Sequence, residues 1–198
     1  VRALQATARA HEMSSGRKFP LAHAAAFARA IADCLAPDCE RIEVAGSIRR
    51  RKPEVGDIEL VAVPRLVEGE RTELFGPPSL QSALDQHLAE LECAGRLVPH
   101  PERPASGERY KRLWAARAEV QVDLFIVGEP EYQWGPILVI RTGPAAFSRD
   151  LVTRLWTQGR RSVEGSVVEV ETGQRIPCPT EERFFELSGR DWVPPERR

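Results

Sequence analysis

Apolar residues in the first third of the chain follow first a helical and then a strand period. In residues 21–35 they fall at positions 21, 25, 28, 31 and 35, along one face of an amphipathic helix. The helix is expected to end at Ala36-Pro37-Asp38, because a residue before proline disfavours the helical conformation. Residues 41–45 then alternate as a strand does, and a second, more apolar strand is expected over 57–63.

The remaining pattern continues with helices and strands. Gly and Pro interrupt residues 65–80, which are expected to be an exposed connection, and residues 97–107 are loop-like. The sequence Gly128-Glu129-Pro130 marks a change in character, so we divide the chain near residue 129. The expected elements are helices over 82–95 and 145–158, a hairpin of strands over 109–115 and 119–127, short strands around 166–171 and 174–176, and a last helix opening at Thr180.

These elements predict an α+β protein in two parts. Residues 17–128 are expected to form a mixed sheet with helices on one side, and residues 129–198 a small α/β subdomain. Residues 1–16 are Ala-rich with a helical period, which predicts an N-terminal helical extension.

Composition narrows the class of protein without identifying it. The 198 residues are 42% hydrophobic and 29% charged, which is typical of a soluble globular protein. No apolar run approaches the roughly 20 residues that span a bilayer, and no secretory signal opens the chain. The four cysteines lack zinc-ligand spacing, so we expect reduced thiols in a cytoplasmic protein without membrane contact. Buried packing is expected for at least three of the four tryptophans.

The charge is balanced overall but unevenly distributed. A formal net charge of −1 argues against a protein that coats nucleic acid indiscriminately. Basic residues nevertheless gather at 49–52, 109–117 and 141–161 and at the C-terminus. Each group is able to contact phosphate, although a solvated face is the simpler interpretation of any one of them.

The densest chemical pattern lies in residues 46–61. In a strand, Asp57 and Glu59 share one face, while the apolar residues beside them enter the core. Adjacent carboxylates repel unless a cation lies between them, and Mg²⁺ prefers oxygen ligands. Gly46 and Ser47 offer backbone and hydroxyl donors to an anion. Metal ligands beside a phosphate-binding turn indicate nucleotide chemistry; a solvated strand edge is the alternative.

A third carboxylate lies in the apolar strand predicted over 119–127. Its apolar residues alternate inward, which leaves Asp123 on the other face. An unpaired, desolvated Asp costs several kcal/mol, so pairing with an arginine or with a metal ion is expected. Beside Asp57 and Glu59, it completes a cluster of three carboxylates.

Together these residues resemble the polymerase beta-like nucleotidyltransferases, the X family of DNA polymerases. Family members carry Gly-Ser-x-Arg-Arg, a short loop, Gly-Asp-x-Asp and a later Asp on an apolar strand. The likeness continues through residues 141–148 and the ending of residues 184–198, so it covers roughly residues 17–198. The matching residues of the main motifs are Gly46, Ser47, Arg49, Arg50, Gly56, Asp57, Glu59 and Asp123.

The resemblance implies a palm, residues 17–128, and a nucleotide-closing thumb, residues 129–198. It implies transfer of a nucleotidyl group from a dNTP or NTP to a DNA 3′-hydroxyl, with release of pyrophosphate. Two Mg²⁺ ions, replaceable by Mn²⁺, would lie about 3.5–4 Å apart. Asp57 and Glu59 would bridge them, and Asp123 would bind one ion and help to deprotonate the hydroxyl.

The resemblance also assigns contacts with the nucleotide and DNA. The triphosphate would be bound by Gly46, Ser47, Arg50, Gly56 and Lys18, the sugar and base by Arg141, Thr142, Gly143 and Ser148, and DNA by Arg149 and Arg154. The chain departs from the family at five positions. Glu59 replaces the usual Asp, Ile140 and Arg141 replace an aromatic pair, Ser148 replaces an Asn, and Gln121 replaces a basic residue.

The partner expected from the likeness is primer–template or gapped DNA. No lyase or helix-hairpin-helix region is visible in the sequence, so binding should be weak and salt-dependent. One alternative is untemplated transfer to RNA, protein or a small molecule. Another is a nucleotide-binding subunit recruited by a protein partner that supplies DNA affinity. A bacterial or phage setting is expected from the compact size.

Overall fold

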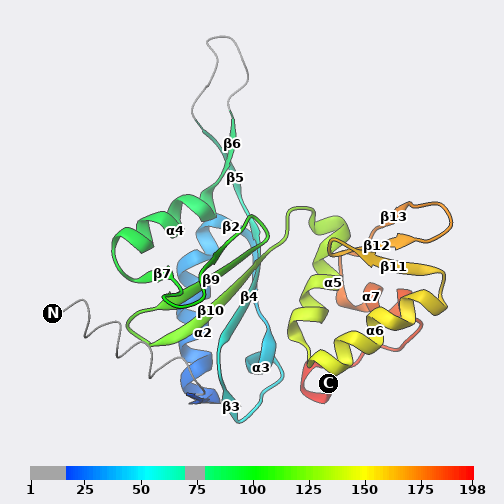
Figure 1. Ribbon diagram of the computed structural model, residues 1–198, viewed down its shortest axis with the longest axis horizontal. Coiled ribbons are helices and arrows are strands. Elements are labelled where there is room, and N and C mark those ends of the chain that lie inside the picture. The colour runs from blue at the N-terminus through cyan, green and yellow to red at the C-terminus, as the bar shows by residue number, and fades with distance from the viewer. Residues whose placement is uncertain (1–16, 70–78) are drawn as a thin grey trace.

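The computed structural model describes residues 17–69 and 79–198, and the α+β class predicted from the sequence is confirmed (Figure 1). A mixed sheet with two helices on one side forms the first part of the molecule. Helices and a small antiparallel sheet form the C-terminal part beside it. The predicted N-terminal extension, residues 1–16, lies outside the described residues.

The main sheet has the order β2-β4-β10-β9-β7, with β8 also paired to β9. The central strands β4 and β10 are parallel, whereas their other neighbours pair antiparallel. The strands are β2 (Cys39–Val44), β4 (Ile58–Pro64), β7 (Leu97–Pro99), β8 (Ala105–Ser106), β9 (Tyr110–Ala115) and β10 (Val120–Ile126). The prediction of a loop over 97–107 was therefore wrong at β7 and β8, which are too short to show an alternating pattern.

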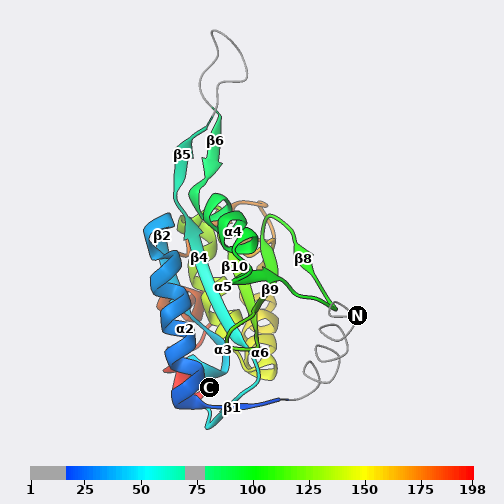
Figure 2. The ribbon, with the colours of Figure 1, turned by 90° about the vertical axis from the view of Figure 1, so that its left-hand side faces the viewer.

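Two helices cover one face of this sheet, and α2 runs along it in Figure 2. They are α2 (Leu21–Leu35), which has the predicted bounds, and α4 (Ala83–Cys93). The Ser82 hydroxyl caps α4 by accepting a 3.1 Å hydrogen bond from the Asp85 amide. Both helices pack on apolar side chains of β4 and β10, so the intervening residues of these strands face away.

The opposite face of the sheet is partly covered by α5 (Pro130–Thr142). Trp134 and Leu138 of α5 pack there against Val61 and Phe125. The sequence did not predict this helix, because Gly and Pro lie in its interior. Tertiary packing explains the glycine: a Cβ at Gly135 would lie 2.1 Å from the Thr180 carbonyl oxygen.

The C-terminal part has its own apolar cluster, which includes Leu151, Leu155, Phe184 and Phe185. Its elements are α6 (Ala145–Thr157), β11 (Arg160–Val163), β12 (Ser166–Glu169), β13 (Arg175–Ile176) and α7 (Glu181–Leu187), which Thr180 caps.

Shorter elements connect these parts. The pair β1 and β3 lies at one end of the sheet, and the pair β5 and β6 forms a ribbon projecting from the other (Figure 1). The remaining bounds are β1 (Phe19–Pro20), η1 (Ala36–Asp38), α3 (Gly46–Arg49), β3 (Glu54–Val55), β5 (Leu66–Glu68), β6 (Leu80–Ser82) and η2 (Pro195–Arg197).

The expectation that at least three tryptophans are buried was wrong. Trp134 is buried, but Trp156 and Trp192 are 59% and 43% exposed. All four cysteines, which lie in the described part of the chain, are free thiols, as predicted. Over residues 17–69 and 79–198, no helix has the length and apolar character needed to cross a membrane.

Candidate active site

Three charged side chains form a row across the centre of the sheet. Glu59 of β4 lies directly beside Asp123 of β10, and Asp123 lies opposite Arg112 of β9. Adjacent strands are about 4.8 Å apart, so all three side chains emerge close together on the face away from α2 and α4. Asp57 precedes β4 by one residue and extends the row toward β3. We call Asp57, Glu59 and Asp123 the carboxylate row. The register thus brings together the three predicted carboxylates, which are 66 residues or less apart in sequence.

The surroundings of Asp57 and Glu59 disfavour their charged forms. Burial raises the pKa of Asp57, and the charge of Asp123 adds to this effect. Burial, together with the charges of Asp57 and Asp123, raises the pKa of Glu59 to about 7. Arg50 and Arg141 oppose the increase at Glu59 without cancelling it. This is the electrostatic pattern that a divalent cation between the carboxylates would relieve.

Asp123 is already engaged by protein donors. Its Oδ1 accepts hydrogen bonds from Tyr110 Oη at 2.7 Å and from Arg112 Nε at 3.0 Å. Its Oδ2 accepts a bond from Gln121 Nε2, also at 3.0 Å. The arginine pairing considered as an alternative to a metal role is therefore present.

In this conformation the three carboxylates suit a divalent cation by their chemistry but not by their geometry. Three carboxylates supply the oxygen ligands that Mg²⁺ prefers. Within residues 17–69 and 79–198, however, no three His, Cys, Asp or Glu side chains converge closely enough to hold a metal ion. Asp57 and Glu59 are available to a cation, whereas Asp123 would have to exchange at least part of its present bonding.

The turn that carries Gly46 and Ser47 adjoins the same carboxylates. Gly46 has a φ of +61°, and a Cβ there would lie 1.8 Å from Glu59 Oε2, so the backbone of this turn contacts Glu59 directly. Ser47 Oγ and Arg50 Nε are buried and have no hydrogen-bond partner among the described residues. Buried polar atoms are nearly always paired, so these two donors are candidates for binding an anionic group at the turn.

A cavity of about 420 Å³ opens on the other side of Asp57 and Asp123. Gly56 and Lys18 both line it, which places Lys18 at this cavity rather than at the Gly46 turn. The Lys18 ammonium lies 3.4 Å from a Glu54 carboxylate oxygen, in an exposed ion pair. A Cβ at Gly56 would meet nothing within 4 Å in the described structure, so packing does not explain this glycine.

The chain is similar in sequence and in fold to known DNA polymerases. The family model described as the DNA polymerase beta thumb matches residues 137–198, which we call the thumb region. DNA polymerase lambda from Rattus norvegicus is 28% identical over 169 residues, which cover 77% of the chain. A ternary P/T complex of Leishmania infantum polymerase beta superposes with a TM-score of 0.69 at 16% identity, over 93% of this chain and 78% of that one.

The chain is similar to polymerase beta in its fold. Residues 137–198 match the thumb model, and the fold is similar to that of the solved polymerase structure over 93% of this chain. The chain spans 28% of the length of the curated relative that it matches.

Two of the residues expected to contact the nucleotide instead have internal partners in this polymerase beta-like fold. Thr142 is fully buried, and its hydroxyl accepts a 2.8 Å hydrogen bond from Arg49 Nη1. The Ser148 hydroxyl is also buried and donates to the Ile140 carbonyl at 3.1 Å. In this conformation both hydroxyls are therefore engaged by internal hydrogen bonds.

Arg141 and Gly143 lie closer to the carboxylate row. The Arg141 guanidinium stacks 4.0 Å from the centre of the Phe125 ring, and its charge acts on Glu59. A Cβ at Gly143, whose φ is +67°, would lie 2.9 Å from Arg50 Nη1. Arg50 also donates to the Thr142 carbonyl oxygen, so it connects the Gly46 turn to the end of α5.

The two arginines expected to contact DNA are exposed on α6 of the thumb region. Arg149 lies on its solvent side, and Arg154 forms a 2.8 Å ion pair with Asp150 one turn earlier. Nothing in their contacts distinguishes a DNA-binding face from a solvated one.

A buried ion network joins the sheet to the thumb region. Arg49 donates two hydrogen bonds to Glu181 at 2.6 and 2.7 Å, and Arg198 Nη1 donates to the same carboxylate at 2.9 Å. Burial alone would raise the pKa of Glu181, but the hydrogen bonds and charges of Arg49 and Arg198 hold it below its usual value. Arg49, matched to the family motif, is therefore a structural link in this conformation.

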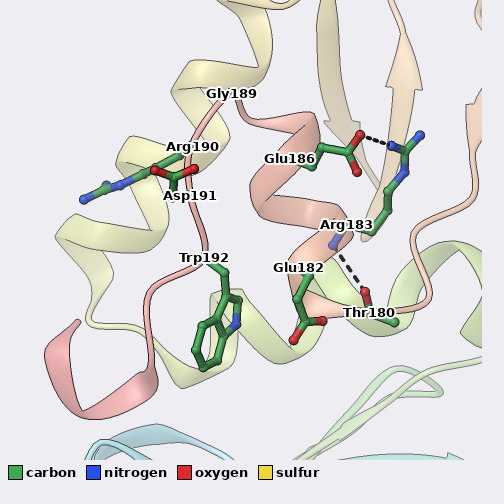
Figure 3. A pocket seen from close by; sticks show the side chains of 8 residues that line it. All are labelled: Thr180, Glu182, Arg183, Glu186, Gly189, Arg190, Asp191 and Trp192. Atoms are coloured by element: carbon green, nitrogen blue, oxygen red, sulfur yellow. Dashed lines mark hydrogen bonds and ion pairs between the residues drawn. The ribbon is translucent and has the colours of Figure 1, made fainter.

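The thumb region also carries a large, open hollow of about 840 Å³ (Figure 3). Trp192 lies at one end of it, and the Arg183–Glu186 ion pair and the Thr180 cap lie near the other. Its lining residues do not include the carboxylate row or the Gly46 turn. The hollow is thus separate from the candidate site.

The sequence missed Tyr110 and Arg112 as members of the site. Arg112 was part of the basic group at 109–117, but a hairpin register is needed to place it opposite Asp123. The apolar strand around Asp123 was the one available signal, because it required a cationic partner.

Proposed function

We propose that the chain is a nucleotidyltransferase that adds nucleotides from a dNTP or NTP to a DNA 3′-hydroxyl and releases pyrophosphate. The observation that carries the proposal is the contact between the Gly46 turn and Glu59, which lies beside Asp123. Because of this contact, the unpaired donors Ser47 Oγ and Arg50 Nε, which suit an anion, lie next to carboxylates that suit a divalent cation. The likeness to DNA polymerases supports DNA as the acceptor.

In this proposal each side chain of the site has a defined task. Asp57, Glu59 and Asp123 would hold two Mg²⁺ ions, with Mn²⁺ able to replace them. Such ions neutralise phosphate charge and lower the pKa of a bound hydroxyl. Ser47 Oγ and Arg50 Nε, with the backbone at Gly46, donate hydrogen bonds to the triphosphate and stabilise the charge of the leaving pyrophosphate. Lys18 and Gly56 border the cavity beside the carboxylates.

We further propose that residues 17–128 act as the palm and residues 129–198 as the thumb. The separate apolar clusters of the sheet and of the C-terminal part support this division. Arg141 and Gly143, at the end of α5, would then border the bound nucleotide. Arg149 and Arg154 are exposed on α6 and are assigned to DNA.

Extension of a labelled primer tests the proposal. Gapped and single-stranded DNA would be incubated with each dNTP and NTP in Mg²⁺ or Mn²⁺. Asp57→Asn should lower the rate at least about a thousandfold, because it removes charge that acts directly on the reacting groups. Asp33→Asn, an exposed change on α2, is the matched control and should leave the rate unchanged.

The products of this assay separate the alternatives. Template-matched addition that is lost in Asp57→Asn would support a polymerase. Addition regardless of template would indicate terminal transfer by the same site. Equal activity in Asp57→Asn and Asp33→Asn would contradict the site assignment.

A further inference from the structure

The ion pair with Arg112 engages Asp123, one of the three carboxylates proposed to hold the metal ions. Asp123 is 9% exposed in its side chain and Arg112 27%, so this pair is shielded from solvent. The bond to Asp123, which outweighs burial, raises the pKa of Arg112. The guanidinium therefore remains charged beside the carboxylate.

The hydrogen-bond count shows why this pair matters for a metal ion. An ionised carboxylate offers about four lone pairs. Tyr110 and Arg112 use both positions on Oδ1, and Gln121 uses one on Oδ2. One position on Oδ2 remains, and a cation approaching it would be repelled by the guanidinium charge.

Arg112 also lines the cavity of about 420 Å³ beside the carboxylates. The cavity contains four basic side chains and three acidic ones, so it carries a net positive charge. Arg17 and Lys18 are paired with Glu119 and Glu54, whereas the carboxylate partner of Arg112 is Asp123, a proposed metal ligand. A phosphate, like a carboxylate, matches a guanidinium in both charge and geometry.

Resting on the function proposed above, we infer that Arg112 is a displaceable counter-cation of Asp123. A phosphodiester of the acceptor strand that enters the cavity takes the Arg112 guanidinium, and this frees Asp123 for a divalent ion. Arg112 is thus a positioning residue that couples acceptor binding to completion of the metal site. No covalent step is involved: one ion pair is exchanged for two others.

The first test measures Mn²⁺ binding without DNA, by the electron paramagnetic resonance signal of free Mn²⁺. Arg112→Gln should tighten binding by about tenfold, the scale on which one charge at 4–6 Å alters the proton affinity of a carboxylate. Arg103→Gln is the matched control, because it removes the same charge from the same cavity. In the described structure Asp123 accepts from Tyr110, Arg112 and Gln121, and not from Arg103. Thermal unfolding would establish that each variant is folded. If Arg112→Gln does not fold, Tyr110→Phe, which removes another hydrogen bond to Asp123 Oδ1, would take its place in the test.

The second test adds a short single-stranded oligonucleotide with phosphodiester or uncharged methylphosphonate linkages, after subtraction of Mn²⁺ bound to the oligonucleotide alone. The phosphodiester should tighten Mn²⁺ binding to the wild-type protein more than the methylphosphonate does, and Arg112→Gln should lose this difference. The inference about Arg112 would be overturned by unchanged or weaker Mn²⁺ binding in Arg112→Gln, or by a difference between the two oligonucleotides that this variant retains. Neither result would contradict the proposed function. Absence of Mn²⁺ binding in both proteins would instead contradict the proposed function.

Discussion

At the scale of single residues, Gly46 shows how backbone conformation and site chemistry coincide. Its φ of +61° favours glycine, and its Cα faces the Glu59 carboxylate so closely that a Cβ would lie 1.8 Å from Oε2. Gly95 has nearly the same φ, +63°, but a Cβ there would meet nothing within 4 Å in the described structure. Substitution of Gly95 therefore measures the cost of the backbone conformation alone, whereas substitution of Gly46 also includes the cost of contact with Glu59.

Gly46→Ala should lower the free energy of unfolding by about 3 kcal/mol, against about 1 kcal/mol for Gly95→Ala. Both variants place a Cβ in the left-handed region, but Gly46→Ala must also displace Glu59. Urea unfolding followed by tryptophan fluorescence measures the difference. Equal losses in the two variants would show that the contact between the turn and Glu59 is not close in solution.

The residues of the site differ in how far the sequence predicted them. Asp57 and Glu59 were predictable because their i, i+2 spacing follows from strand geometry alone. The internal hydrogen bond of Ser148 was not predictable, because its position in a motif says nothing about which way its hydroxyl points in α6. Arg112 depends on the register of β9 against β10, which is a property of the folded sheet.

At the scale of elements, Glu181 holds the start of α7 against α3 and the C-terminal residue. The Arg198 side chain is fully buried and that of Glu181 is 8% exposed, so the network is shielded from water. Removal of one member of a buried ion pair leaves its partner charged and unpaired, which is more costly than loss of an exposed pair.

Glu181→Gln should lower the free energy of unfolding at pH 7 by about 3–5 kcal/mol. Glu186→Gln, which breaks an exposed pair on the same helix, should cost about 1 kcal/mol or less. The pKa of Glu181 is lower in the folded protein than in the unfolded chain, where it is about 4.3. The charged carboxylate therefore stabilises the fold fully above about pH 4.3, and this stabilisation is lost as the pH falls toward the folded pKa. Denaturant titrations from pH 7 to pH 3 should therefore show the gap between wild type and Glu181→Gln closing below about pH 4.3. A gap that stays constant with pH would contradict the assignment.

Element prediction succeeded where one local pattern decided the structure. The helix over 21–35 has the bounds that its apolar stripe predicts. Helix α5 was missed because Gly135 and Pro136 disfavour a helix locally, whereas packing against β4, β10 and the start of α7 favours it. Strands β7 and β8 exist through their pairing with β9 rather than through a pattern of their own.

At the scale of the whole molecule, the carboxylate row lies where the sheet meets the C-terminal part. The Gly46 turn contacts Glu59 on one side and, through Arg50, the end of α5 on the other. Movement of the thumb region would therefore act on the turn proposed to bind the triphosphate. The chain's likeness to polymerases in both sequence and fold fits this arrangement.

The most direct measurement is an anomalous difference map from crystals of the full chain soaked with Mn²⁺ and a dNTP. The account predicts two Mn²⁺ peaks in contact with the carboxylate row, both bound by Asp57 and Glu59 and one also by Asp123, with the triphosphate at Ser47 and Arg50. Peaks elsewhere, or none at the row in a crystal that has bound the dNTP, would contradict it.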